Sequence, residues 1–343
     1  MQAGSKAVRQ SNMELLRILA AAGVIILHFN ARALPAAGGM TRWALLLLEL
    51  VSGCAVNVYV MLCGYFLYKR ERVSVYKPLS LLLQLLVYRL TMHLIELAVG
   101  SSEFTWKGLL LLVVPTDYFL ILYAALYLLS PIINRVVALQ DDRKLRRFLL
   151  LLFLLFSVWN YALNLLETLT GLRFASASTV GAAGAQEGYT IVNFALCYCI
   201  GAAIGRKSIR IRRPEWLFLL CLAAELVISR RNVYLSVAYH SPFLICQAAC
   251  ALLMAEKVKL HSGVINFFAR STLSVYMVHM HLLARFDPAS CAWRSLPESM
   301  AYLALAVVSI YAVGAAAHCL YEAAARPIRR RLTARVHFPE ISL

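Results

Sequence analysis

The chain has 343 residues, of which 61% are hydrophobic and only 15% are charged, and its mean hydropathy is +0.71. A water-soluble domain of this length cannot hide so much apolar surface, so the composition excludes an ordinary soluble fold. The net charge of +17 indicates no nucleic-acid partner, because the cations lie in short segments between apolar runs. We therefore expect an all-α, multi-pass protein of the cell (plasma or inner) membrane, surrounded by membrane lipids.

Apolar runs of near-spanning length recur along the whole sequence and predict about ten transmembrane helices. Ser11 and Glu14 predict a capping box at the start of the first helix. The segment 105–115 is apolar but too short to span, which is typical of a re-entrant or interfacial segment. We expect a ten-helix membrane domain over 1–325 and a short basic cytoplasmic tail over 326–343. The ten predicted helices cover residues 13–30, 44–68, 78–100, 116–137, 147–166, 189–206, 214–229, 238–255, 265–284 and 299–323.

The orientation follows from the distribution of cations. Most of the 34 Lys and Arg residues fall in one alternating set of the segments between predicted helices. The positive-inside rule places that set, and both termini, in the cytoplasm. The first predicted helix then runs outward, with Arg17 toward the cytoplasm and His28 near the outer face. The ninth predicted helix also runs outward and brings His279 to a similar depth, so both histidines are expected to line one outward-facing chamber.

Arg17 and His28 are the first candidate pair for chemistry. They are eleven residues apart, which places their side chains within roughly 20° of one helix face and roughly 16 Å apart along the axis. A permanent cation and a titratable base on one stripe of a membrane helix are costly to place there, so we interpret them as functional. The alternative for Arg17 is that it only extends to the interface.

Other polar residues inside the predicted helices are further candidates for substrate binding. Asn57 lies on the second helix and Asp117 at the outer start of the fourth. Arg89 lies near mid-depth on the third helix, where it either serves a substrate or neutralises a buried carboxylate such as Glu96.

The remaining His and Cys residues predict no metal site. His279 and His281 are two positions apart, so they point about 200° away from each other around a helix and cannot bind one metal from one face. Most of the nine cysteines fall in apolar runs, where a free thiol behaves as a small hydrophobic group. His318 and Glu322 are four positions apart and are predicted to pair with one another.

Four short motifs occur in order along these helices: Arg17 with His28 after ten residues, Asn57–Leu67 with its Gly64-Tyr65 step, Tyr118-Phe119-Leu120 followed by Tyr127–Asn134, and Ser271–His279. Together they resemble the acyltransferase-3 family of integral membrane acyltransferases, many of which O-acetylate bacterial surface carbohydrates. The third-helix segment departs from the family pattern, because Tyr76-Lys77-Pro78 replaces its usual Arg-rich run.

The resemblance implies an acyl donor on the cytoplasmic side, namely acetyl-CoA or a related acyl-CoA as cosubstrate. The acceptor is implied to be a hydroxyl of a cell-surface carbohydrate or lipid-linked sugar on the far side. Arg17 suits phosphate or pantetheine oxygens of the donor. His28 suits general-base work near neutral pH, or it carries the acyl group itself. His279 or Asn57 would stabilise the oxyanion or position the sugar.

The predicted substrate-binding residues are Asn57, Tyr65, Arg89, Asp117 and Tyr118. Asn57, Tyr65 and Tyr118 belong to the motifs, whereas Arg89 and Asp117 are candidates because they are polar residues in or beside the predicted helices. Some members of the family carry a fused extracytoplasmic domain that completes the transfer. This membrane domain is expected to act alone or to pass the acyl group to a separate extracytoplasmic transferase.

The competing interpretation is a transporter or polysaccharide exporter without acyl-transfer activity. Carriers often show internal repeats or paired broken helices, and the two halves of this sequence show no convincing repeat. A carrier also has no evident need for a base on the same stripe as an anion-binding cation. A non-catalytic membrane scaffold is the third possibility.

Overall fold

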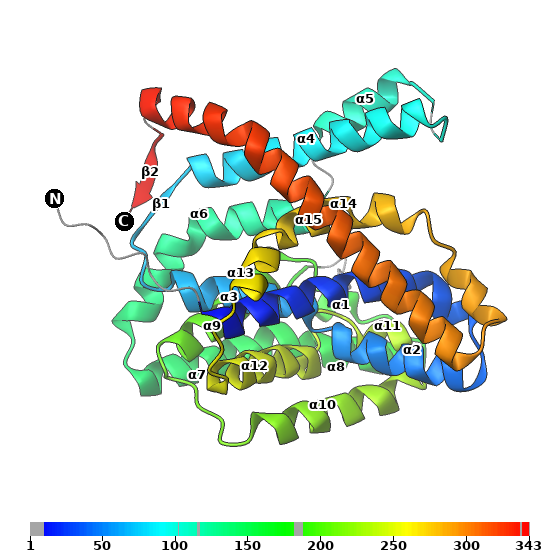
Figure 1. The fold of residues 1–343 in the computed structure, drawn as a ribbon. Helices are drawn as coiled ribbons and strands as arrows, with labels where there is room; N and C mark the ends of the chain where they lie inside the picture. Colours follow the sequence, from blue (N-terminus) through cyan, green and yellow to red (C-terminus); the bar gives the residue numbers. More distant parts are fainter. Residues whose placement is uncertain (1–9, 102, 115–116, 182–187, 337, 343) are drawn as a thin grey trace.

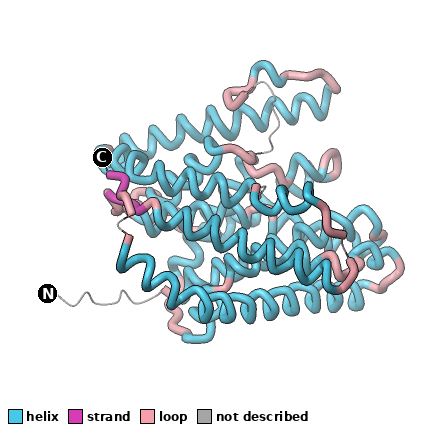
Figure 2. Tube along the Cα trace, turned by 90° about the horizontal axis from the view of Figure 1, so that it is seen from above, coloured by secondary structure: helices cyan, strands magenta, loops and turns pink. Residues whose placement is uncertain are grey.

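The computed structural model describes residues 10–342 except 102, 115–116, 182–187 and 337, and the side chains of 333–335 are not described. Residues 1–9 and residue 116, the predicted start of the fourth helix, therefore lie outside the described part. Within it the chain is nearly all helix, with one small sheet of two antiparallel strands, as Figures 1 and 2 show.

The elements follow the apolar runs of the sequence closely. In chain order they are α1 (Ser11–Ala36), α2 (Gly39–Ser52), α3 (Ala55–Leu67), β1 (Arg72–Ser74), α4 (Tyr76–Ala98), α5 (Trp106–Val113), α6 (Tyr118–Leu139), α7 (Asp142–Phe153), a π-helical turn (Leu154–Val158), α8 (Trp159–Thr170), a 3-10 turn (Ala175–Ala177), α9 (Ile191–Gly205), α10 (Pro214–Ser229), α11 (Val233–Ser236), α12 (Pro242–Lys257), α13 (Gly263–Arg270), α14 (Thr272–Leu283), a 3-10 turn (Pro288–Ala292), α15 (Leu296–Arg335) and β2 (Glu340–Ser342).

The described residues form six helices that are long and apolar enough to cross a membrane, and two shorter apolar helices, Ile191–Gly205 and Thr272–Leu283. The all-α membrane fold is thus confirmed, whereas ten spans and cytoplasmic termini stay predictions. The six candidate spans are Ser11–Ala36, Gly39–Leu67, Tyr76–Ala98, Trp106–Leu139, Asp142–Thr170 and Leu296–Leu332. Three of them include more than one element, namely α2 with α3, α5 with α6, and α7 with the π-helical turn and α8.

Two predicted helices are broken in the structure. The helix predicted over 44–68 consists of α2 and α3, which meet at Gly53, where Leu244 of α12 approaches to 3.0 Å from the position of an added Cβ. The helix predicted over 265–284 consists of α13 and α14. The break follows Ser271, whose hydroxyl donates to the carbonyl oxygen of Phe268 at 2.7 Å and competes with the helical ladder.

The capping box predicted at the start of α1 is wrong. The Ser11 hydroxyl accepts a hydrogen bond from the backbone N–H of Ser262 at 3.0 Å, and Glu14 binds the guanidinium of Arg17 at 2.8 Å. A tertiary partner therefore occupies the Ser11 hydroxyl, and a residue one turn along the same helix occupies the Glu14 carboxylate. The structure has a capping box at the start of α15 instead.

The C-terminal segment is part of the fold. The predicted domain boundary at residue 325 lies inside α15, which continues to Arg335. Beyond it, β2 pairs antiparallel with β1, and the backbone N–H of Val75 donates to the carbonyl oxygen of Pro339 at 3.1 Å. The rings of Tyr76 and Phe338 also lie 4.7 Å apart, so this segment is attached directly to the start of α4 (Figure 1).

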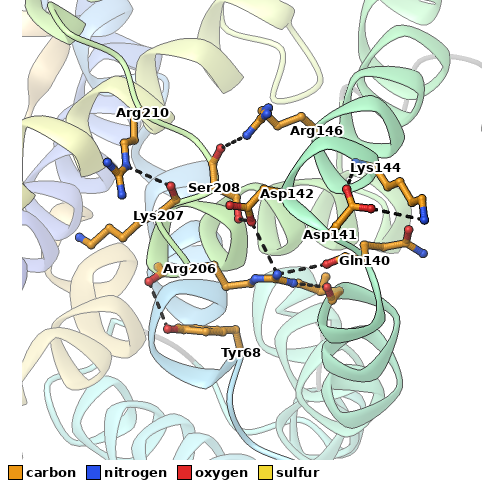
Figure 3. Close-up of polar contacts among 12 residues, drawn as sticks. Tyr68, Gln140, Asp141, Asp142, Lys144, Arg146, Arg206, Lys207, Ser208 and Arg210 are labelled. Atoms are coloured by element: carbon orange, nitrogen blue, oxygen red, sulfur yellow. Dashed lines mark hydrogen bonds and ion pairs between the residues drawn. The ribbon is translucent and has the colours of Figure 1, made fainter.

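A polar network joins the ends of α6, α7 and α9 (Figure 3). The guanidinium of Arg206 donates to the carbonyl oxygen of Gln140 at 3.1 Å and lies 3.6 Å from the Asp142 carboxylate. Asp141 caps α7 by accepting the backbone N–H of Lys144 at 2.8 Å, and this bond lowers the pKa of the Asp141 carboxyl below its usual value. The network fixes one end of the helix bundle.

The closest helix contact is between α3 and α9. A Cβ on Gly64 would lie 2.0 Å from the carbonyl oxygen of Tyr198, and one on Gly201 would lie 2.0 Å from that of Met61. Only glycine lets two backbones approach this closely. α1 packs against α2, α3, α12, α13 and α14, so this pair of helices supports one side of α1.

We predict that Gly64→Ala forces α3 and α9 apart and lowers the free energy of unfolding by about 1–3 kcal/mol, as overpacking does. Thermal unfolding of the purified protein in detergent measures the change. Gly38→Ala is the matched control, because nothing lies within 4 Å of a Cβ added there. Equal unfolding temperatures for the two variants would contradict the prediction.

Candidate active site

The structure brings His28 of α1 and His279 of α14 together. Their ring centroids lie 5.0 Å apart, at an angle of 41° between the ring planes. The expectation that these two histidines share one chamber rested on their predicted depths, and the helices do place them in contact. His28 is exposed, whereas the side chain of His279 is buried behind it.

Hydrogen bonding fixes the tautomer of His279. Its Nδ1–H donates to the carbonyl oxygen of Tyr276, which can only accept. Its Nε2 is buried and has no hydrogen-bond partner among the described residues. In the neutral ring Nε2 therefore carries a lone pair and no proton. The pair consists of an accessible imidazole and a buried imidazole that is oriented as an acceptor.

Arg17 lines a cavity of about 660 Å³. α1, α3, α4, α6, α14 and α15 contribute to its wall, together with the end of α13. Four cations line the cavity, against one carboxylate, Glu322. The cations are Arg17, Lys77, Arg270 and Arg329.

Contacts within the wall hold most of these cations. Arg17 binds Glu14 at 2.8 Å, and Arg329 lies 2.5 Å from Glu322. The ammonium of Lys77 lies 4.7 Å from the ring centroid of Tyr127. Glu14 and Glu322 balance two of the four cations, so Lys77 and Arg270 leave the lining positive, which favours an anion.

An aromatic layer separates the cavity from the histidines. The ring of Phe119 lies 5.3 Å from that of Tyr276 and 6.0 Å from that of Tyr59, and all three rings line the cavity. The ring of Tyr276 lies 5.4 Å from that of His279 on the other side. A molecule that fills the cavity therefore ends one aromatic ring away from the histidine pair.

Asn57 and Tyr65 lie outside the lining of this cavity. Asn57 is fully buried, its Nδ2 donates to the carbonyl oxygen of Tyr239 at 2.8 Å, and its Oδ1 accepts from Asn193 at 3.3 Å. The hydroxyl of Tyr65 donates to Glu256 of α12 at 2.9 Å. These contacts give both residues a role in packing α3 against its neighbours.

Arg89 also lies apart from the cavity. Its guanidinium donates to the carbonyl oxygen of Val114 at 2.7 Å, next to α5. The carboxylate of Glu96, the predicted alternative partner, lies 2.9 Å from Nδ1 of His281. The side chain of Arg89 therefore joins α4 to the end of the short helix α5.

Asp117 and Tyr118 lie at the start of α6, directly before Phe119 of the aromatic layer. The ring of Tyr118 lies 4.4 Å from that of Tyr189, whose ring lies 4.8 Å from that of Tyr239. These tyrosines form an aromatic cluster at the N-terminal end of α6.

Three of the cavity cations could not be identified from the sequence. Lys77 and Arg329 were interpreted as signals of topology, because they lie in short basic segments. The predicted pair of His318 and Glu322 is wrong, since Glu322 pairs with Arg329 and His318 lies 3.2 Å from the Ser274 hydroxyl. No local pattern in the sequence indicates that Arg270, at the break between α13 and α14, faces the same cavity.

The fold and site define a multi-pass membrane protein with a cationic cavity that leads toward a histidine pair. A family described as an acyltransferase domain matches residues 10–318. The chain belongs to the acyltransferase-3 family, as its four motifs predicted, and is accordingly a membrane acyltransferase. No curated protein and no solved structure matches the chain.

We predict that Asn57→Leu lowers the free energy of unfolding by about 1–3 kcal/mol, because the buried Asn193 amide and Tyr239 carbonyl each lose one hydrogen-bond partner and keep only the bond between them at 3.3 Å. Thermal unfolding of the purified protein checks this. Gln140→Leu is the control, since the Gln140 side chain makes no hydrogen bond with any described residue. An unchanged unfolding temperature for Asn57→Leu would show that this amide has no structural role.

Proposed function

We propose that this protein transfers an acetyl or related short acyl group from cytoplasmic acyl-CoA to a hydroxyl of a cell-surface carbohydrate or lipid-linked sugar, across a bacterial inner membrane. The observation that carries the proposal is the position of the histidine pair one aromatic ring away from a cationic cavity. A donor in the cavity and an acceptor from the opposite side would meet at these rings.

The cavity suits the donor. Its cations match the phosphates of coenzyme A, and guanidinium groups bind phosphate through paired hydrogen bonds. Arg17 and His28 share one face of α1 and are roughly 16 Å apart along its axis, so an extended pantetheine arm would run along this helix. The thioester would reach His28 when the ring of Phe119 or Tyr276 moves aside.

In the proposed reaction His28 removes the proton of the acceptor hydroxyl while its oxygen attacks the thioester carbonyl. The C–S bond breaks, the ester forms, and the coenzyme A thiolate receives the proton. His279 positions His28, because its Nε2 accepts an N–H of His28 once the rings align. The other nitrogen of His28 then faces the hydroxyl.

The fixed tautomer of His279 also argues against one of its predicted roles, stabilisation of the oxyanion. Its N–H group is engaged by the Tyr276 carbonyl, so neutral His279 has no donor left for an oxyanion. Acylation of His28 itself is the alternative route. His279 would position His28 in this route as well. That route predicts ping-pong kinetics, whereas direct transfer requires both substrates to be bound together.

We predict that His28→Ala abolishes acyl transfer. Ester-linked acyl groups are released by mild alkali from the surface carbohydrate of a deletion strain, a strain complemented with the native chain, and one complemented with His28→Ala at equal membrane abundance. Ester restored by the native chain alone supports the proposal. A strain with His261→Ala is the matched control, because His261 is exposed in the loop before α13.

Unchanged ester content in all of these strains would overturn acyl transfer to surface carbohydrate. The competing function is then transport, and the export of unmodified polymer would differ between the deletion strain and the complemented strain. Ester restored by His28→Ala would retain the activity and reject His28 as the base.

We predict that His279→Leu lowers kcat by roughly a hundredfold, the scale of a mispositioned general base, with little change in the KM for acyl-CoA. His279→Gln restores part of the rate, because its amide oxygen can accept the N–H of His28. Steady-state kinetics with purified protein separate kcat from KM. Equal rates for His279→Leu and the native chain, or equal losses with leucine and glutamine, would reject the positioning role.

A further inference from the structure

A second cavity, of about 520 Å³, lies between the inner end of α6 and the loop that joins α3 to β1. It shares no lining residue with the cavity of the candidate active site. Its lining contains one carboxylate, Glu71, against four cations, which are Lys69, Arg70, Arg135 and Arg206.

Most of this positive charge is not neutralised by the protein. Arg206 lies 3.6 Å from Asp142 within the network of Figure 3. In the described part of the chain, no carboxylate lies within ion-pair distance of Lys69, Arg70 or Arg135. The cavity therefore presents cations without a paired carboxylate to a bound ligand.

Hydrogen bonds hold the backbone of the loop that carries Lys69 and Arg70. The amide of Asn134, which is 4% exposed, donates to the carbonyl oxygen of Arg70 at 2.8 Å and accepts from the Tyr198 hydroxyl at 2.8 Å. On the other side of the same loop, the Tyr68 hydroxyl donates to the carbonyl oxygen of Gly205 at 3.1 Å. The loop that carries Lys69 and Arg70 is thus fixed from two directions, which is a feature of a built site.

The cavity lies beside an apolar, exposed face of a membrane-spanning segment. α6 belongs to the candidate span Trp106–Leu139, and four of its hydrophobic side chains are 41–76% exposed: Leu129, Ile132, Val136 and Leu139. Lipid chains cover such a face in a bilayer. The Lys and Arg distribution predicts that this end of α6 lies at the cytoplasmic surface, where lipid phosphates are found.

We propose that this cavity binds the phosphate-bearing headgroup of an anionic membrane lipid, with the lipid chains along α6. The cations supply the charge that selects an anionic over a zwitterionic headgroup. The exposed face of α6 favours a lipid over a free phosphate compound, which has no use for apolar surface. This site is independent of the proposed acyl transfer.

The test measures binding of phosphatidylglycerol and phosphatidylcholine to the purified full chain in neutral detergent, by native mass spectrometry. Arg70→Gln with Arg135→Gln should weaken phosphatidylglycerol binding roughly 25-fold, because each cation near an anionic lipid contributes about 1 kcal/mol, or roughly fivefold. Arg212→Gln with Arg213→Gln is the control, since it removes equal charge from the exposed loop before α10. Phosphatidylcholine binding should not respond to either pair.

Three results would overturn the proposal. Equal losses with the two double variants would show a general charge effect with no specific site. Unchanged phosphatidylglycerol binding in Arg70→Gln with Arg135→Gln would show that the cavity is not involved. Displacement of the lipid by millimolar inorganic phosphate or 3′,5′-ADP would show a site for soluble phosphates or nucleotides. Thermal unfolding of each variant in the same detergent confirms that a loss of binding is not a loss of fold.

Discussion

The contact between His28 and His279 is the interaction on which the proposed chemistry depends, and it requires α1 and α14 to pack at one depth. An unpaired polar ring inside a membrane protein is expensive. The structure limits that cost by giving the buried ring a backbone partner, Tyr276, and by leaving its neighbour accessible. The position of α1, between the α3 side of the bundle and α14, therefore determines both the fold and the site.

Local helix geometry made the first part of the site predictable. Arg17 and His28 share a face because eleven residues exceed three helical turns by only about 20°, and no tertiary information is needed to see this. The pairing with His279 followed from depth, which the cation distribution supplied. The breaks at Gly53 and Ser271 were not predictable. The first lies where a side chain of another helix, Leu244, packs against Gly53, and the second lies where the Ser271 hydroxyl bonds its own backbone.

The roles of Lys77 and Arg329 in lining the cavity could not be predicted for a related reason. Lys77 and Arg329 lie near the ends of membrane helices, where the positive-inside rule already accounts for Lys and Arg. A sequence pattern cannot separate a cation that sets topology from one that also faces a cavity. Conversely, Asn57 and Tyr65 belong to a motif of the family, yet their described contacts join helices to one another. A motif thus mixes residues for folding with residues for chemistry.

The pairing of β2 with β1 couples the two long helices α4 and α15 to each other. β1 leads directly into α4, which carries Lys77, and β2 follows α15, which carries Arg329. The two cations line the same cavity, and the paired strands join the helices that carry them. A shift of α4 or α15 is therefore transmitted to the other helix, so the parts of the cavity lining that carry Lys77 and Arg329 move together.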